Sequence, residues 1–264
     1  MPELAEVEYF RRQWDAGIGH RVLKVSLHPR KRLFRGTDTA ALRRNLIGAR
    51  LLRSEARGKR MLFWFSGDNW LGLLLGMTGK FRVESSNFRP SKHDHLVLYQ
   101  RHQALVFTDS RQFGRVQFHH GKDEPIWWKS ATPEIASASF RRAFFEDFLN
   151  RHGKAPIKAV LLMQSGFSGI GNWMADEILW RAKVLPSKRT TKLSAHERTA
   201  IFRATKFVVR RSLQTLGQDF SDPPRTWLIH QKWKRDGTCP IHHTLLRHAT
   251  VAGRTTAWCP RCQR

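Results

Sequence analysis

The apolar residues of this chain change their spacing near residue 130, and that change restricts the fold more than any other feature. Between residues 21 and about 130, short runs rich in Val, Leu, Phe and Trp are separated by Gly, Asn, Asp and Pro. This pattern is typical of antiparallel strands in a sandwich or barrel. From about 133 onward, apolar residues recur at helical spacing between Gly, Pro and capping residues. The sequence therefore predicts an α+β chain with a β-rich part followed by an all-helical part.

Individual elements follow from the same pattern. An opening helix over 3 to about 15 places apolar side chains on one face, and a shorter helix is expected near 38–46. Strands are predicted within 21–28, 49–58, 59–66, 96–100, 103–109 and 114–120, and helices within 133–153, 155–164, 171–184 and 194–217. We expect three domains: a helix and β-sandwich over 1–130, a helical domain over 131–220, and a loop with a cysteine-bearing hairpin over 221–264.

The charge of the chain indicates its partner. Lys and Arg number 47 against 21 Asp and Glu, which gives a formal net charge of +26. A charge of this size repels itself unless an anion neutralises it, so nucleic acid is the expected partner and a membrane surface the alternative. The longest apolar runs, "WLGLLLGM" and "MLFWF", are too short to span a bilayer, and no hydrophobic signal segment follows the N-terminus. We therefore expect a soluble intracellular protein.

The three cysteines all lie near the end of the chain. They form a Cys-x2-His pair and a Cys-x2-Cys pair that are separated by sixteen residues. Two such turns joined by a β-hairpin bring four donors to one tetrahedral point, which suits one structural zinc ion. The predicted ligands are Cys239, His242, Cys259 and Cys262. His243 could replace His242, and reduced cysteines without a metal are the alternative.

A Gly-rich turn, "QSGFSGIG", precedes the predicted helix that opens near Asn172. Backbone amides at such a helix start, with glycines that permit close approach, form a phosphate seat. A packing role for the glycines is the alternative, and the strong positive charge favours phosphate. The Asn172 side chain could add a hydrogen bond to the same phosphate.

Six motifs, taken in order, resemble those of the formamidopyrimidine-DNA glycosylases and their endonuclease VIII relatives. They are "PELAEVE" at the start, "RGKRM" at 57–61, "LGMTGKF" at 75–81, "DSRQFGR" at 109–115, "SGIGNWMADEILW" at 168–180 and the C-terminal cysteine hairpin. The resemblance spans nearly the whole chain. It implies an N-terminal helix with an antiparallel β-sandwich, a helix-two-turns-helix domain and a zinc-finger hairpin, with DNA held between the halves.

The resemblance implies a bifunctional DNA glycosylase and abasic-site (AP) lyase of base excision repair. After removal of Met1, Pro2 would carry a secondary amine with a pKa of about 8 or lower, able to attack C1′ of a damaged nucleotide. The resulting Schiff base would release the 3′ and then the 5′ phosphate by β,δ-elimination. Glu3 is the implied acid at the sugar ring oxygen, and Glu6 would orient the terminus or a water. Lys59 would contact the phosphate beside the lesion and donate a proton during base loss.

An enzyme that extrudes a base must fill the gap that it leaves. The resemblance implies that Met77 and Phe113 enter the stack while Arg111 pairs with the orphaned base, a combination similar to the purine-lesion branch. The alternative is that Met77 and Phe113 are core residues, but the glycines beside them favour exposed turns. The residues implied to hold the kinked DNA backbone are Asn172, Arg254, Lys59 and His93.

Three departures from the family pattern limit the substrate assignment. Ala5 stands where proline is common, and His242 replaces the usual second cysteine, although imidazole still binds zinc. The longer Gly-rich loop of the purine-lesion branch is replaced by "SDPPRTWLIHQKWK", which contains Trp227 and Trp233. This loop cannot close over 8-oxoguanine in the same way. Ring-opened purines, oxidised pyrimidines, bulky adducts and cross-links remain open as substrates.

A noncatalytic binder of damaged or kinked DNA is the main alternative, because the charge supports binding and catalysis equally. Pro2 followed by Glu3 favours the enzyme, since binding alone requires neither. A zinc-ribbon RNA-binding protein would explain the charge and the tail but not Met77, Arg111 and Phe113. We expect a monomeric, cytoplasmic, nucleoid-associated bacterial protein that binds double-stranded DNA with a damaged base or abasic site and has no membrane partner.

Overall fold

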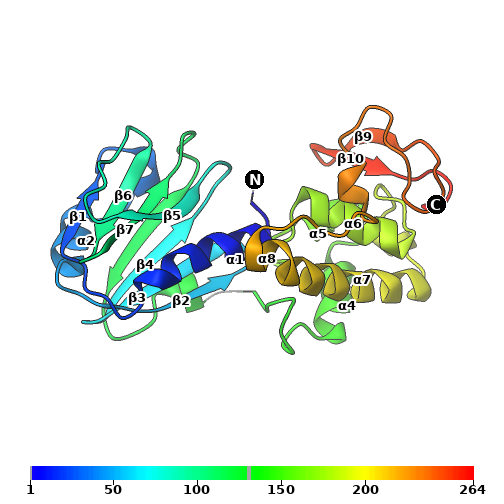
Figure 1. Ribbon diagram of the computed structural model, residues 1–264. Helices are drawn as coiled ribbons and strands as arrows, with labels where there is room; N and C mark the ends of the chain where they lie inside the picture. Colours follow the sequence, from blue (N-terminus) through cyan, green and yellow to red (C-terminus); the bar gives the residue numbers. More distant parts are fainter. Residues whose placement is uncertain (1, 130–131) are drawn as a thin grey trace. The chain divides into compact units, whose positions relative to one another are not determined.

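The computed structural model describes residues 2–129 and 132–264, which divide into two compact units (Figure 1). Unit 1 contains Pro2 and the residues from Glu6 to the gap, and unit 2 contains Glu3–Ala5 and the residues after the gap. Met1, whose removal was predicted, and the predicted boundary between 130 and 131 lie outside the described residues. The division into three domains stays a prediction.

Unit 1 begins with the predicted amphipathic helix. Helix α1 (Leu4–Gln13) continues into a 3-10 turn, η1 (Trp14–Gly17). Its apolar face carries Trp14 into the core, where the indole stacks on the ring of Phe81 with the centroids 4.3 Å apart. The predicted short helix is α2 (Thr39–Leu46), and the Asp38 carboxylate caps it by accepting from two backbone N–H groups.

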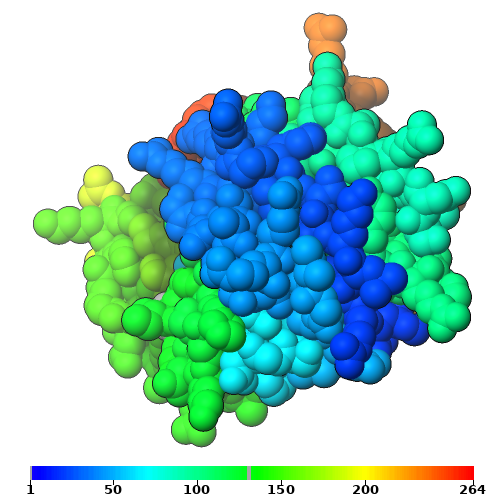
Figure 2. All heavy atoms as spheres, turned by 90° about the vertical axis from the view of Figure 1, so that its left-hand side faces the viewer, coloured from blue at the N-terminus to red at the C-terminus, as the bar shows by residue number. Residues whose placement is uncertain are grey.

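Two four-stranded antiparallel sheets form the body of unit 1, in the orders β2-β3-β4-β8 and β1-β6-β7-β5. Their side chains meet in one buried cluster, which confirms the predicted sandwich. In Figure 2, which shows one face of the molecule, blue residues from the start of the chain lie beside teal residues from later in unit 1. The strands are β1 (Lys24–Leu27), β2 (Leu51–Arg57), β3 (Arg60–Phe65), β4 (Asn69–Leu74), β5 (Lys80–Ser85), β6 (Asp94–Tyr99), β7 (Gln103–Thr108) and β8 (Arg115–His120).

A short helix that the sequence did not predict, α3 (Ile126–Lys129), lies against the sheet with the order β2-β3-β4-β8. A Cβ atom at Gly72 of β4 would lie 2.4 Å from the Trp127 ring, so a glycine is needed where the indole lies on the strand. Trp128 is fully buried beneath the Arg57 guanidinium, which lies 4.5 Å from its ring centroid. This cover explains why β4 reads as a continuous apolar run instead of an alternating one.

Unit 2 is helical around one apolar core, as predicted. Its longest helix starts at a capping box, in which Ser194 and Glu197 each accept the other's backbone N–H. The helices are α4 (Arg142–Arg151), α5 (Ile157–Leu161), α6 (Asn172–Ala182), α7 (Ala195–Gln214) and α8 (Leu216–Asp219). No helix formed by the described residues combines the length and the hydropathy needed to cross a membrane.

The helix predicted over 133–153 is shorter than expected, because α4 begins only at Arg142. The Ser137 hydroxyl donates to the Glu134 carbonyl and also contacts the Ser139 hydroxyl. Serine side chains that bond to nearby backbone compete with helical hydrogen bonds, so this stretch folds as turns. Ile135 and Phe140 nevertheless anchor it to the core, and both are buried.

The chain ends in the predicted hairpin, formed by β9 (Arg247–Val251) and β10 (Arg254–Trp258). Ala252 and Gly253 form its turn, both with positive φ (49° and 73°), as a tight two-residue hairpin requires. Arg254 follows this turn directly and is exposed.

Candidate functional site

The Glu3 side chain lies at the start of α6. Its Oε1 accepts the backbone N–H of Trp173 at 2.9 Å, and its Oε2 accepts those of Gly171 and Met174 at 2.9 and 3.1 Å. Only 3% of Glu3 is exposed. A carboxylate at this position is favoured by the helix dipole and satisfies N–H groups that have no partner within the helix. Glu3, a predicted catalytic residue, is therefore fixed in place by the helix.

This arrangement corrects one prediction. The sequence suggested that backbone amides at the start of this helix form a phosphate seat, but the amides of Gly171, Trp173 and Met174 already bond to Glu3. A Cβ atom at Gly171 would lie 2.3 Å from the Glu3 Cδ, so the glycine is needed for the carboxylate. The sequence missed this contact because its partners lie about 170 positions apart.

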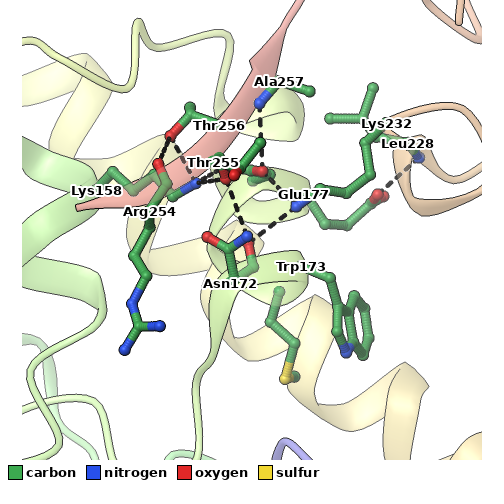
Figure 3. Close-up of polar contacts among 12 residues, drawn as sticks. Lys158, Asn172, Trp173, Glu177, Leu228, Lys232, Arg254, Thr255, Thr256 and Ala257 are labelled. Carbon is green, nitrogen blue, oxygen red and sulfur yellow. Dashed lines mark hydrogen bonds and ion pairs between the residues drawn. The ribbon is translucent and has the colours of Figure 1, made fainter. Parts of the chain in front are cut away.

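Asn172 lies beside the hairpin (Figure 3), and its Nδ2 donates to the Thr255 carbonyl at 2.9 Å. Its Oδ1 is buried and has no hydrogen-bond partner among the described residues. Arg254, the residue before Thr255, points away from this network in Figure 3. Two of the residues predicted to contact DNA, Asn172 and Arg254, are thus brought together.

A buried ionic triad supports this region and was missed by the sequence analysis. The Asp176 carboxylate contacts the ammonium groups of Lys158, at 2.6 Å, and of Lys232. Lys158 also donates to the Thr255 carbonyl at 3.0 Å and to the Thr256 hydroxyl at 2.8 Å. Burial lowers the pKa of Lys158 to about 8, although Asp176 opposes that shift. The sequence carried one sign of this triad, because the adjacent acidic residues Asp176 and Glu177 lie among the apolar residues of the helix predicted over 171–184.

The other member of that pair, Glu177, is also buried. Burial raises its pKa to about 7, even though Arg181 donates to its Oε1 at 2.8 Å and the Leu228 N–H to its Oε2 at 2.7 Å. The bond to Leu228 ties α6 to the 3-10 turn η4 (Leu228–His230). Glu177 therefore helps to hold the loop that departs from the family pattern.

That loop is packed into unit 2. Trp227 is 2% exposed, and its ring centroid lies 6.3 Å from that of Trp173 and 6.2 Å from that of Phe207. Trp233, by contrast, is 61% exposed. The first of the two predicted loop tryptophans is thus a core residue, and the second lies on the surface.

The four predicted metal ligands come together at the base of the hairpin. One donor atom from each of them lies within 4.8 Å of the others, and such a group could hold a metal ion. The cluster contains His242 and does not contain His243. The Trp180 indole N–H donates to the Cys239 sulfur at 3.3 Å, and the Gln263 side chain accepts the Cys259 N–H at 2.8 Å. These neighbours fix the positions of two ligands.

In unit 1, Lys59 occupies the predicted turn between β2 and β3, beside Gly58 with φ of 61°. Glu6 is half-buried in the first turn of α1. His93 is half-buried just before β6, where its carbonyl accepts the Asp109 N–H at 3.0 Å and the Thr108 hydroxyl at 3.0 Å. The opening helix that carries Glu6 and the turn that carries Lys59 were predicted, whereas no element was predicted for His93.

The three predicted gap-filling residues lie on exposed turns and not in the core. Met77 is 42% and Phe113 47% exposed, and the Arg111 guanidinium lies 4.9 Å from the Phe113 ring centroid. The two turns are adjacent, since a Cβ atom at Gly76 would lie 2.3 Å from the Phe113 carbonyl carbon. The prediction that these side chains are exposed is confirmed.

Asp109 holds the two turns together and was not predicted. It is fully buried and accepts the Thr78 hydroxyl from one turn and, at 2.7 Å, the Gly114 N–H from the other. The Arg111 N–H lies 3.3 Å from the same carboxylate. A buried carboxylate with several donors is a strong geometric restraint. Asp109 therefore positions Met77 and Phe113 relative to each other.

Comparisons with known proteins agree with these features. Residues 1–116 match the model of the formamidopyrimidine-DNA glycosylase N-terminal domain, and residues 131–223 match that of the formamidopyrimidine-DNA glycosylase H2TH domain. The chain is 31% identical to the formamidopyrimidine-DNA glycosylase of Thermus thermophilus, covering all of this chain and 98% of the relative. It is 30% identical to the Solibacter usitatus enzyme over the full length of both.

Solved structures of this family are similar to the chain over nearly its full length. The Lactococcus lactis Fpg protein bound to oxidised-pyrimidine DNA superposes with a TM-score of 0.90 at 27% identity, covering 100% of both chains. The same protein bound to abasic-site DNA gives 0.89 at 27% identity, covering 99% of each chain. The chain belongs to the formamidopyrimidine-DNA glycosylase family.

Proposed function

We propose that this protein is a bifunctional DNA glycosylase and AP lyase of base excision repair. The observation that carries the proposal is Pro2, directly followed by a Glu3 carboxylate that three backbone N–H groups hold in place. The full-length match to the family supports the same assignment. A protein that only binds DNA would need neither residue.

The mature chain begins at Pro2 once Met1 is removed. The neutral secondary amine forms a bond to C1′ of the damaged nucleotide, and the base leaves with the bonding electrons and takes up a proton. Opening of the sugar ring then gives a Schiff base between Pro2 and C1′. Loss of a proton from C2′ expels the 3′ phosphate, and a second elimination expels the 5′ phosphate.

Three further side chains assist these steps. Glu3 protonates the sugar ring oxygen, and Glu6, one turn along α1, orients the amine or a water. Lys59 binds the phosphate beside the lesion from its tight turn and gives a proton to the departing base. Glu3→Gln keeps an oxygen for the helix N–H groups but cannot deliver a proton, so it should slow base loss while the fold persists.

The substrate is double-stranded DNA with an extruded base. Met77 and Phe113 enter the space left in the stack, and Arg111 bonds to the orphaned base on the other strand. Their exposure and their restraint by Asp109 support this role. Asn172, Arg254, Lys59 and His93 contact the phosphates of the kinked strand, and the net charge of +26 favours the same partner.

One zinc ion completes the hairpin. Three thiolates and one imidazole, from Cys239, His242, Cys259 and Cys262, match the donors that tetrahedral structural zinc prefers, and their mutual approach within 4.8 Å fits one ion. With four protein ligands, the ion supplies rigidity to the hairpin and takes no part in the chemistry. Arg254 depends on that rigidity for its position.

The packed Trp227 loop argues against 8-oxoguanine as the preferred lesion. Solved structures of the similar L. lactis protein contain DNA with an N7-benzyl-Fapy-dG or an oxidised pyrimidine. We therefore propose ring-opened purines and oxidised pyrimidines as the first substrates to test, for a monomeric enzyme that acts on the chromosome in the bacterial cytoplasm.

Single-turnover excision on a set of duplexes tests this function. Each duplex carries one lesion, with an undamaged duplex as the control, and base release is measured separately from strand cleavage. The expected result is release of at least one damaged base with coupled cleavage, lost in Pro2→Gly while affinity for an abasic-site duplex persists. Tight binding to damaged duplexes without base release would instead identify a noncatalytic damage binder.

A further inference from the structure

An open pocket of about 590 Å³ lies beside Phe113 in unit 1. It is lined by Arg32, Arg35, Gly36, Leu74, Gln112, Phe113, Gly114 and Arg115. None of these lining residues, all within the described range 2–129, is acidic. The pocket adjoins the turn assigned to the DNA stack but includes none of the residues assigned to the phosphates.

The three arginines of the pocket differ from many other arginines of the chain in their lack of side-chain partners. Within residues 2–129 and 132–264, the side chains of Arg32, Arg35 and Arg115 form no ion pair or hydrogen bond, and all three are exposed. Three guanidinium groups without a counter-charge around one concave surface create a concentrated positive potential. They are free to bond to an anion, because no carboxylate competes for their donors.

The walls of this pocket are fixed by buried residues. Leu33 and Phe34 of the 3-10 turn η2 (Arg32–Phe34) lie between Arg32 and Arg35 in the sequence and are 0% and 3% exposed. The Thr37 hydroxyl donates to the Val116 carbonyl at 2.7 Å, which ties this turn to β8 next to Arg115. The arginines therefore project from a rigid frame, so that little backbone ordering is needed when an anion binds.

We propose that Arg32, Arg35 and Arg115 form a phosphodiester-binding pocket, which takes the DNA phosphate that flanks the base step entered by Phe113. Guanidinium groups pair with phosphate through two parallel N–H bonds, and a volume of about 590 Å³ has room for a sugar-phosphate segment. Gln112 adds an amide that can bond to the sugar or a base edge.

The inference rests on the proposed function, because it uses the position of Phe113 in the stack. Arg111 meets the orphaned base, and Phe113 enters the stack two residues later. Gly114 and Arg115, the two residues after Phe113, line the pocket. A phosphate in the pocket would therefore resist withdrawal of the Phe113 ring from the stack. We assign the pocket the role of holding the kinked duplex on this side of unit 1.

The test measures how binding to a tetrahydrofuran abasic-site duplex depends on salt. The variants are Arg32→Gln, Arg35→Gln and Arg115→Gln, singly and combined, with Arg44→Gln of α2 as an exposed control that has no side-chain partner among the described residues. Each phosphate contact contributes a slope of about 0.9 in the plot of log affinity against log salt. The triple Gln variant should reduce the magnitude of the slope by about one or more. Arg44→Gln should leave the slope unchanged, and a triple Arg→Lys variant, which keeps the positive charges, should retain most of both slope and affinity.

A second arm locates the phosphate. Duplexes with one neutral methylphosphonate at successive positions on either strand are bound to wild-type and triple Gln variant. At one position near the lesion, the substitution should weaken wild-type binding but leave the variant unchanged. Equal weakening in both proteins at every position, or an unchanged salt slope in the triple variant, would overturn the pocket. If wild-type protein does not prefer the abasic duplex to an undamaged one, the proposed function itself fails.

Discussion

The ammonium nitrogen of Lys158 lies 2.6 Å from Oδ1 of Asp176, and neither side chain is exposed. The ammonium of Lys232, which is 1% exposed, contacts the other oxygen of the same carboxylate. One buried carboxylate therefore contacts two buried ammonium groups. Because Lys158 also bonds to Thr255 and Thr256 of β10, the triad joins the helical core to the hairpin that carries Arg254.

Removal of the central charge should be costly. Asp176→Asn leaves two buried ammonium groups without a counter-charge and should lower the free energy of unfolding by about 3–5 kcal/mol. Lys232→Met keeps the Lys158–Asp176 pair and should cost much less. Urea unfolding at pH 7 with the metal bound measures both variants, and equal losses would show that Asp176 does not hold the triad together.

Glu177 should give the stability a distinct pH dependence. Because its pKa is raised to about 7, the folded chain keeps a proton that the unfolded chain loses above its ordinary value of 4.5. The stability from this protonation is complete below pH 4.5 and is lost as the pH rises through 7. The whole shift corresponds to about 3 kcal/mol. Glu177→Gln should make the decline between pH 5 and 8 smaller, and parallel curves for the two proteins would refute the assignment.

The gap-filling turns should depend on Asp109. Thr78→Val removes one hydrogen bond to this carboxylate and should slow base excision by about fivefold, since a buried hydrogen bond of this kind contributes about 1 kcal/mol. Thr199→Val, in α7, is the matched control because Thr199 is half-buried and its hydroxyl donates to the Ala195 carbonyl within the same helix. Single-turnover rates on the best lesion distinguish the variants. Identical rates for both variants would show that Asp109 does not position the turns that carry Met77 and Phe113.

Metal removal should weaken the proposed contact between Arg254 and the DNA. We expect one zinc per chain by elemental analysis, and weaker binding to an abasic-site duplex after chelation or in Cys259→Ser, because the hairpin loses its rigid frame. His243→Ala should keep the metal, whereas His242→Ala should lose it. The reverse pattern, or full affinity in the metal-free protein, would contradict the assigned ligands.

Local patterns predicted much of this molecule. The Lys59 turn, the start of α6 at Asn172 and the metal ligands each depend on residues close together in the sequence. The pairings that fix the site are of another kind: Glu3 bonds to amides about 170 positions away, and Asp176 pairs with lysines from two other segments. No periodicity or short motif encodes such contacts. The predicted helix over 133–153 failed for a local reason, because serine side chains bond to the backbone there.

The most direct test of the proposed chemistry is borohydride trapping on an abasic-site duplex, with the N-terminus of the purified protein determined by mass spectrometry. We expect a chain that begins at Pro2 and a covalent DNA adduct that peptide mapping places on that residue. Pro2→Gly should show slower trapping at unchanged affinity. A processed terminus, tight binding and no adduct on any duplex would contradict the assignment of Pro2 as the nucleophile.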